Sequence, residues 1–227
     1  MKKFTIPKDP YDERIMFGKT TLTLEDNSIS CLVGCNGSGK STVLYFIKRQ
    51  LEKRGAYELR GKYLDLRGIF NKPKYNDEIF LFFDKKSKTF NNEEESIFKE
   101  LLANTLSTGE SIYNRFGDKL ALLGNAIRNP ENKGKSIYVF MDDCDAGTSI
   151  DMINDIKSIF DLIIKDCKKH GITYYLILTA NSYELCKDVD CISIHDFTHK
   201  KFDDYEQYKK FILESREVKD KSLKTIE

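Results

Sequence analysis

The sequence LVGCNGSGKST occupies residues 32–42 and says more about the fold than any other stretch of the chain. Residues 34–41, GCNGSGKS, fit the pattern G-x-x-x-x-G-K-[S/T]. Glycines allow a loop of this pattern to bend so that successive backbone N–H groups point at phosphate oxygens. The helix after such a loop presents unpaired N–H groups and the positive end of its dipole to the same anion. The pattern therefore predicts a phosphate-binding loop.

Strand and helix signals flank this loop, as the motif requires. SISCLV at residues 28–33 predicts a buried strand, and residues 41–54 predict a helix that Gly55 ends. Lys40 is placed to reach the β- and γ-phosphates and to act in catalysis, and Ser41 is placed to ligate Mg²⁺. We therefore expect ATP and Mg²⁺ as cofactors. The residues expected to contact the nucleotide are Gly34, Asn36, Gly37, Ser38, Gly39, Lys40, Ser41 and Thr42.

Two acidic residues, Asp142 and Asp143, directly follow the apolar run IYVFM. A P-loop needs a carboxylate at the end of a neighbouring strand to organise Mg²⁺ and its waters, and we predict Asp142 for this role, with Ser41. Asp143 would then lie beside the γ-phosphate, where a carboxylate can take a proton from the attacking water. We therefore predict Asp143 as the catalytic base.

The rest of the chain alternates short strands with helices, which favours an α/β domain with a largely parallel sheet flanked by helices. Further strands are expected at 63–66, 79–84, 136–141, 172–179 and 191–194. Helices are expected at 93–104, within 109–128, and at 150–169 and 203–217. We expect a single domain over residues 1–227, with a core at about 1–66 and 130–200, a helical region at about 90–130 and a C-terminal helix at about 203–217.

Composition narrows the class of protein further. The 37 basic and 36 acidic residues nearly cancel, so whole-chain charge does not indicate nucleic acid or an acidic membrane surface. Three local basic clusters, at 48–54, 85–88 and 199–201, are interpreted as solvated faces. Six cysteines form no C-x-x-C pair, which is typical of a reducing compartment rather than of disulfides or zinc. No apolar run reaches the ~20 residues of a membrane span, so we expect a cytoplasmic protein without direct membrane contact.

Three motifs together resemble those of the ATP-binding cassette (ABC) ATPases. They are GCNGSGKST at 34–42, LSTGE at 106–110 and VFMDDCDAGTS at 139–149, and their order and spacing agree with that family. The segment ILTANSYEL at 177–185 is similar to the soluble branch, which comprises the RecF-like, chromosome-maintenance and overcoming-lysogenisation-defect ATPases.

The resemblance implies an ABC-type fold in which the helical region carries the LSTGE signature. It also implies a homodimer that encloses two ATP molecules head to head. Ser107 and Gly109 would then touch the γ-phosphate bound by the other subunit. Because no heptads and no room for a nuclease domain are found, the chain resembles a bare ATPase head that acts through an effector protein.

The sequence departs from the family pattern at three positions. The catalytic glutamate is replaced by Asp143, and the switch histidine by Asn181, whose amide can donate a hydrogen bond but carries no proton. Asp84 stands about where a glutamine is usual. We therefore expect ATP binding with slow hydrolysis, in which Asn181 takes part. Tyr11 and Phe17 are the candidates for stacking on adenine.

Three functions remain open at this stage. The first is a soluble ATPase that drives or gates a partner in DNA maintenance or antiviral defence, with nucleic acid as a further partner. The second is a non-hydrolysing switch, in which a partner recognises the ATP-closed dimer. The third is the ATPase subunit of an ABC transporter.

Overall fold

The computed structural model describes residues 1–6, 20–59, 77–83, 119–120, 122–146 and 148–224. Within these residues the strands form one seven-stranded sheet and one two-stranded sheet. The order of the large sheet is β4-β5-β6-β7-β3-β8-β9, and every neighbouring pair is parallel except β8 with β9. Its strands are β3 (Ser28–Val33), β4 (Tyr57–Glu58), β5 (Glu78–Phe83), β6 (Ser136–Met141), β7 (Thr173–Thr179), β8 (Asp190–Ser193) and β9 (His199–Lys200). The expected largely parallel sheet is confirmed.

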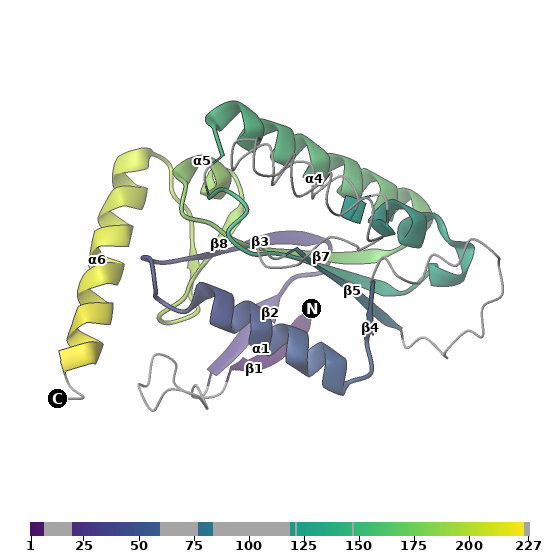
Figure 1. Cartoon of the computed structure of the whole chain (residues 1–227), viewed down its shortest axis with the longest axis horizontal. Coiled ribbons are helices and arrows are strands. Elements are labelled where there is room, and N and C mark those ends of the chain that lie inside the picture. The colour runs from purple at the N-terminus through teal and green to yellow at the C-terminus, as the bar shows by residue number, and fades with distance from the viewer. Residues whose placement is uncertain (7–19, 60–76, 84–118, 121, 147, 225–227) are drawn as a thin grey trace, which may run out of the picture.

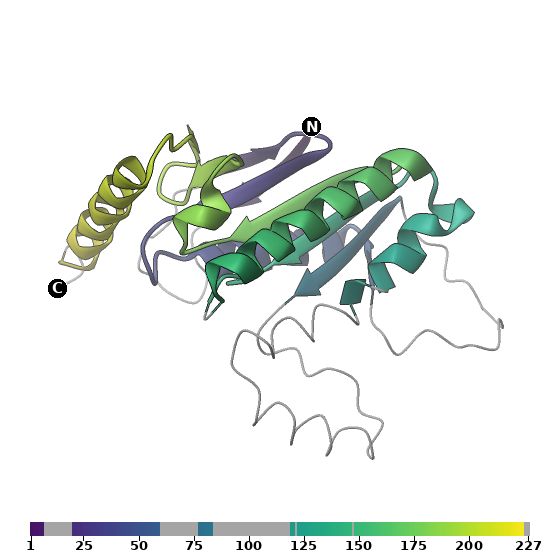
Figure 2. The same ribbon diagram turned by 90° about the horizontal axis from the view of Figure 1, so that it is seen from above.

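Helices cover both faces of this sheet (Figures 1 and 2). Helix α1 (Lys40–Lys53) packs on one face and α4 (Ile150–His170) on the other, because alternate residues of each strand point to opposite faces. In β6, Ile137, Val139 and Met141 belong to the cluster of α4, whereas Tyr138 and Phe140 belong to that of α1. The core is therefore two apolar layers with the sheet between them.

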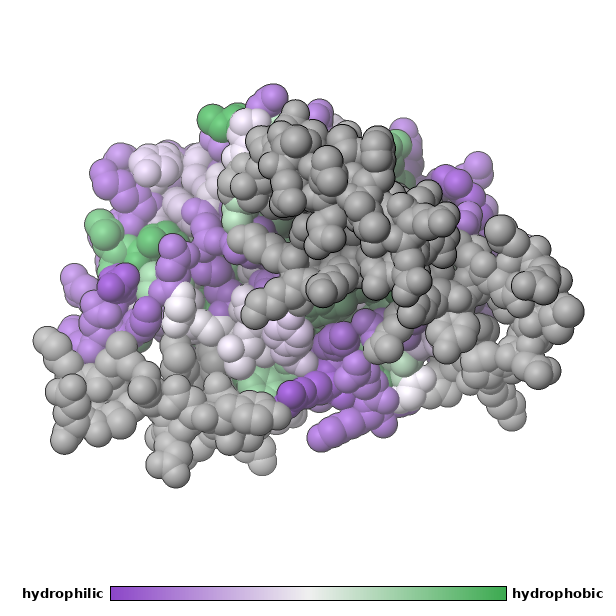
Figure 3. All heavy atoms as spheres, viewed as in Figure 1, coloured by the Kyte–Doolittle hydropathy of each residue, from purple (hydrophilic) through white to green (hydrophobic). Residues whose placement is uncertain are grey.

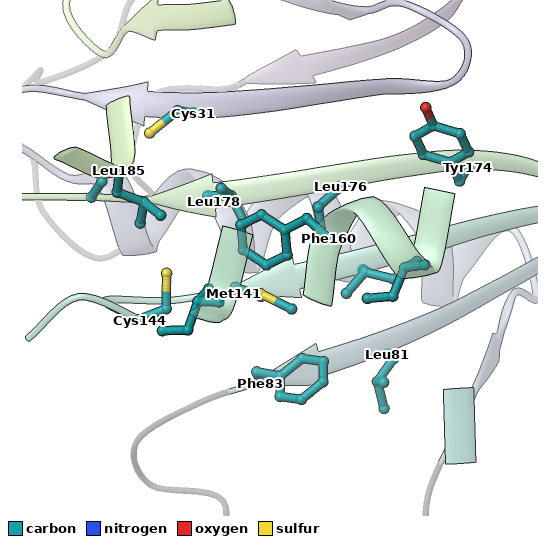
Figure 4. Packing of buried hydrophobic residues seen from close by; sticks show 14 of the residues in the cluster. Cys31, Leu81, Phe83, Met141, Cys144, Phe160, Tyr174, Leu176, Leu178 and Leu185 are labelled. Atoms are coloured by element: carbon teal, nitrogen blue, oxygen red, sulfur yellow. The ribbon is translucent and has the colours of Figure 1, made fainter. Parts of the chain in front are cut away.

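Helix α4 shows how local sequence sets an element. Its apolar residues recur on one side, and Ile153, Ile156, Phe160, Ile163 and Cys167 are buried. Figure 4 shows Phe160 beside Leu176, Leu178 and Met141 of the sheet. Gly171, with a φ of 67°, ends the helix in the left-handed conformation that glycine adopts without strain.

An antiparallel hairpin of β1 (Lys2–Ile6) and β2 (Thr20–Leu24) packs beside α1 (Figure 1). Sequence analysis did not predict this hairpin, nor β4, β9 and the short helix α5 (Tyr183–Cys186). It did predict the C-terminal helix, but α6 (Tyr205–Lys224) runs further than the expected 203–217. The strands predicted at 28–33 and 136–141 have the observed bounds, and residues 122–128 are helical within the expected 109–128.

Several predicted elements lie outside the described residues. They are the strand at 63–66, the helix at 93–104 and the first part of the region 109–128. The division of the chain into a core and a helical signature region therefore stays a prediction.

The sheet brings together cysteines that are far apart in the sequence. All six cysteines are free and buried, and the Sγ atoms of Cys31, Cys186 and Cys191 lie within 4.8 Å of one another. The Sγ atoms of Cys31 and Cys186 are 3.8 Å apart. Sequence analysis found no C-x-x-C pair and did not predict this cluster, because β3 and β8 become neighbours only in the folded sheet.

The described helices include none that combines the length and the apolarity of a membrane span. On the face drawn in Figure 3, the described surface is mostly hydrophilic and its apolar areas are small and separate.

Candidate active site

The predicted phosphate loop connects β3 to α1 and depends on its glycines for shape. Gly37 and Gly39 have φ angles of 72° and 97°, a conformation that residues with a Cβ atom rarely adopt. A Cβ atom on Gly34 would lie 2.6 Å from Cγ2 of Ile194 and 2.7 Å from the Ser38 hydroxyl. All three glycines are therefore required by the observed backbone.

Lys40 folds back onto its own loop. Its Nζ atom donates to the carbonyl oxygens of Gly34 at 2.8 Å and Cys35 at 3.2 Å, and the side chain is buried. Burial lowers the pKa of Lys40. Both acceptors are neutral, so a phosphate oxygen would be a stronger partner for this ammonium group. The Ser38 hydroxyl, also buried, has no hydrogen-bond partner among the described residues, and such a donor fits an anion in this loop.

The two predicted metal ligands are in direct contact. The Ser41 hydroxyl donates to Oδ1 of Asp142 at 2.8 Å, and the Thr179 hydroxyl donates to the same oxygen at 2.7 Å. Mg²⁺ binds oxygens at about 2.0–2.1 Å in an octahedron, whose adjacent ligands are about 2.9 Å apart. The separation of the Ser41 and Asp142 oxygens therefore fits two neighbouring ligands of one Mg²⁺ ion.

Asp143, the predicted base, has a left-handed backbone with a φ of 56°, which is uncommon for a residue with a side chain. Its backbone N–H donates to the Thr179 hydroxyl at 2.7 Å. Its Oδ1 atom accepts a hydrogen bond from the amide Nδ2 of Asn181 at 2.6 Å. Asp143 and Asn181 are thus bonded to each other through their side chains.

Asp145 ties the loop after β6 to the loop after β7. Its buried Oδ2 atom accepts from the backbone N–H groups of Asn181 at 2.7 Å and Ser182 at 2.5 Å. Burial raises the pKa of Asp145, although these two bonds favour its charged form. The brace fixes the backbone from which the Asn181 amide reaches Asp143.

Sheet order explains why these residues meet. Strands β6, β7 and β3 are adjacent and parallel, so their carboxyl ends lie at one edge, where ligands of open α/β sheets bind. Sequence analysis predicted Lys40, Ser41, Asp142, Asp143 and Asn181 for this site, and the structure brings them together.

Two contributing residues were missed, Thr179 and Asp145. The position of Thr179 at the end of an apolar strand was the available signal, and Asp145 stood within the DDCDAGTS segment without an assigned role. Of the other predicted residues, Asn36 is exposed and uses its carbonyl for a contact with α6. Ser107 and Gly109 lie outside the described residues, as do Asp84, Tyr11 and Phe17, so their predicted roles stay predictions.

Comparison with known proteins gives one family match. Residues 23–185 match the family model described as AAA domain, which is well over half of the chain. A comparison with curated proteins finds no match.

Among solved structures, the chain is similar to a nucleotide-free ATP-binding cassette from an ABC transporter, at 15% identity. The alignment covers 93% of this chain and 94% of that one, with a TM-score of 0.48. It is also similar to MJ1267, an ATP-binding cassette of an ABC transporter in its ADP conformation, at 15% identity, 88% and 92% coverage and a TM-score of 0.45. A third is the dimeric bacterial ABC transporter cassette MJ0796, at 13% identity, 89% and 97% coverage and a TM-score of 0.44.

Proposed function

The chain belongs to the AAA domain family and carries a P-loop ATPase domain, and from this premise we propose that it binds ATP with Mg²⁺ and hydrolyses it slowly. The main support is the shared contact of Ser41 and Thr179 with Asp142 beside the phosphate loop. This contact brings a hydroxyl and a carboxylate to the point where a nucleotide-bound Mg²⁺ ion must be held.

Each residue of the site then has a defined part in the reaction. Lys40 exchanges its two carbonyl acceptors for phosphate oxygens, and the N–H groups at the start of α1 face the same phosphates. Ser41 and Asp142 would hold Mg²⁺, which when bound would supply positive charge beside the β- and γ-phosphates. Asp143 accepts the proton of the attacking water.

Slow turnover is supported by the pair of Asp143 and Asn181. An aspartate is one methylene shorter than the glutamate usual in the resembled family, and Asn181, which holds its carboxylate by a hydrogen bond, carries no proton where that family has a histidine. Asp143→Asn should keep ATP binding and lose hydrolysis, because it removes the proposed base and leaves Ser41 and Asp142 in place. Phosphate release by purified protein is the measurement, and wild-type rates in this variant would reject Asp143 as the base.

We also propose a head-to-head homodimer that encloses two ATP molecules, on the basis of the LSTGE resemblance. In such a dimer Ser107 and Gly109 complete the site of the other subunit. In an Asp143→Asn background, Ser107→Arg should leave ATP binding nearly intact and abolish ATP-dependent dimers, because a bulky side chain fills the interface. Light scattering with ATP and Mg²⁺ measures this, and dimers that persist would refute the proposed arrangement.

The proposed role is that of a soluble ATPase in the RecF-like, chromosome-maintenance and overcoming-lysogenisation-defect branch, gating an effector in DNA maintenance or antiviral defence. The similarity of ILTANSYEL at 177–185 to that branch supports it. Phosphate release measured with and without double-stranded DNA tests the link to nucleic acid, and DNA should raise the rate. An unchanged rate would leave an ATPase without this role.

The bond between Asp143 and Asn181 also favours a second function, a non-hydrolysing switch in which ATP closes the dimer and a partner binds the closed form. The two functions differ in one observable. If the protein is a switch, the wild type forms ATP-dependent dimers but releases phosphate no faster than the Asp143→Asn variant does.

A further inference from the structure

Helix α6 lies against the phosphate loop, although it follows that loop by about 180 residues in the sequence. Two side chains one turn apart on α6 contact the loop, Ser215 and Lys219. The Ser215 hydroxyl accepts a hydrogen bond from the backbone N–H of Cys35 at 2.8 Å, and Nζ of Lys219 donates to the carbonyl oxygen of Asn36 at 2.9 Å. Figure 1 shows α6 at one end of the molecule, on the side where α1 begins.

These two contacts determine how two peptide groups of the loop are turned. In a trans peptide the C=O and N–H groups point in opposite directions, and the described residues contain no cis peptide. The Cys35 N–H points to Ser215, so the Gly34 carbonyl of the same peptide points the other way. There it accepts a hydrogen bond from Nζ of Lys40 at 2.8 Å. The Asn36 carbonyl points to Lys219, so the Gly37 N–H points away from α6.

The chemistry of each contact suits its peptide. An acceptor, the Ser215 hydroxyl, meets an N–H group, and a charged donor, Lys219, meets a carbonyl. A cation on a carbonyl polarises the peptide, which makes the N–H of that peptide a stronger donor. Gly37 is also packed against this lysine, because a Cβ atom there would lie 2.8 Å from Nζ of Lys219.

Neither side chain is explained by an ion pair or by simple core packing. Within the described part of the chain Lys219 pairs with no carboxylate, although Arg216 on the same helix pairs with Asp220. Ser215 is a buried polar residue, and its hydroxyl also lies 2.6 Å from Nε2 of His195. The donor of this second hydrogen bond depends on the tautomer of His195, and with either tautomer the contact holds the serine in place.

We propose that α6 is the support that sets the phosphate loop for the nucleotide, and that Ser215 and Lys219 are positioning residues for ATP binding. Ser215 fixes the orientation of the peptide between Gly34 and Cys35. Lys219 fixes the peptide between Asn36 and Gly37, so that the Gly37 N–H points away from α6 and is a stronger donor to a phosphate. This inference rests on the proposed ATP binding, and it adds two residues that lie about 180 positions beyond the loop motif.

The test compares Lys219→Met with Lys210→Met as a matched control. Lys210 is an exposed lysine of the same helix, 4.0 Å from Glu214 and without a contact to the loop among the described interactions. Calorimetric titration with ATP and with ADP, together with the Tm, is measured for each purified full-length variant. We expect Lys219→Met to weaken both nucleotides about tenfold with little change in Tm, and Lys219→Arg to restore affinity to within about threefold. Lys210→Met should match the wild type.

A second variant keeps the inference falsifiable if the lysine variant is poorly folded. Ser215→Thr retains the hydroxyl and should bind ATP nearly as the wild type, whereas Ser215→Ala should bind it several-fold more weakly. If Lys219→Met binds ATP with the affinity of the wild type, this inference is overturned and the proposed function stands. A fall in Tm without a fall in affinity also overturns it, since it shows a purely structural contact. Failure of the wild type to bind any nucleotide overturns the proposed function and this inference together.

Discussion

Replacement of Asn181 by alanine probes the part of the site that departs most from the resembled family. The variant removes the amide that donates to Oδ1 of Asp143 at 2.6 Å. It leaves the backbone N–H of Asn181, which donates to Oδ2 of Asp145 at 2.7 Å. The hydrogen bond between the loops after β6 and β7 is therefore kept. The change therefore isolates the side-chain contact with the proposed base.

The size of the effect follows from the type of bond. A hydrogen bond to a charged group contributes about 1.5–3 kcal/mol, and each 1.36 kcal/mol is a factor of about ten in rate. Asp143 is half-buried and Asn181 is exposed, which places the value at the lower end. We expect kcat to fall by roughly ten- to thirtyfold and ATP affinity to change by less than about threefold.

The assay is single-turnover phosphate release at saturating ATP, with the ATP affinity measured separately. Ser182→Ala is the matched control, because the Ser182 hydroxyl caps α5 by accepting from the Glu184 N–H at 3.2 Å and has no described contact with Asp143. The control should lose about 1 kcal/mol of stability and keep its kcat. Wild-type turnover in Asn181→Ala, or an equal loss in the control, would refute the reasoning.

Four further changes test other parts of the structure. Lys40→Ala should weaken ATP binding at least ~100-fold, because it removes charged hydrogen bonds of about 1.5–3 kcal/mol each, and unchanged affinity by calorimetry would contradict the phosphate-loop assignment. Asp143→Glu should raise kcat several-fold, because the base becomes longer. It should also lower the Tm, because glutamate tolerates a φ of 56° less well than aspartate. Equal or lower phosphate release would mean that the backbone is fitted to the shorter acid. Burial lowers the pKa of His195 below 6.5 in the folded state, so the unfolded chain binds more protons than the folded chain. The free energy of unfolding should therefore fall as the pH drops through 6.5. Urea unfolding at several pH values measures this slope, which should be smaller in His195→Gln. Phe160→Ala should cost about 3–5 kcal/mol in urea unfolding, because the ring is buried between α4 and the sheet, and a loss below about 1 kcal/mol would be inconsistent with this packing.

Local sequence was sufficient for the sheet strands and for most of the site. The apolar runs at 28–33 and 136–141 are buried on both faces, so their composition alone marks them as strands. The phosphate loop and the acidic pair after β6 are local motifs, and strand order then brings them together.

The hairpin and the long-range contacts were harder to predict. In β2 the sequence TTLTL alternates and packs on α1, but it is short and follows a stretch without a strand signal. Nothing in the α6 sequence indicates that Ser215 and Lys219 face a loop about 180 residues earlier, because a charged amphipathic helix has no local mark of its neighbour. Thr179 is likewise a normal strand residue until β6 lies beside it.

The central position of β3 has a consequence for how the protein is made on the ribosome. Its two neighbours, β7 and β8, follow it by about 140 residues or more. At roughly 5–20 residues per second, translation of that stretch takes on the order of ten seconds. During this time the nascent chain carries its ATP-binding motif on an unpaired apolar strand, which is a natural substrate for chaperones. The motif is thus translated well before its neighbours and becomes a binding site only after β7, β8 and the supporting α6 have emerged.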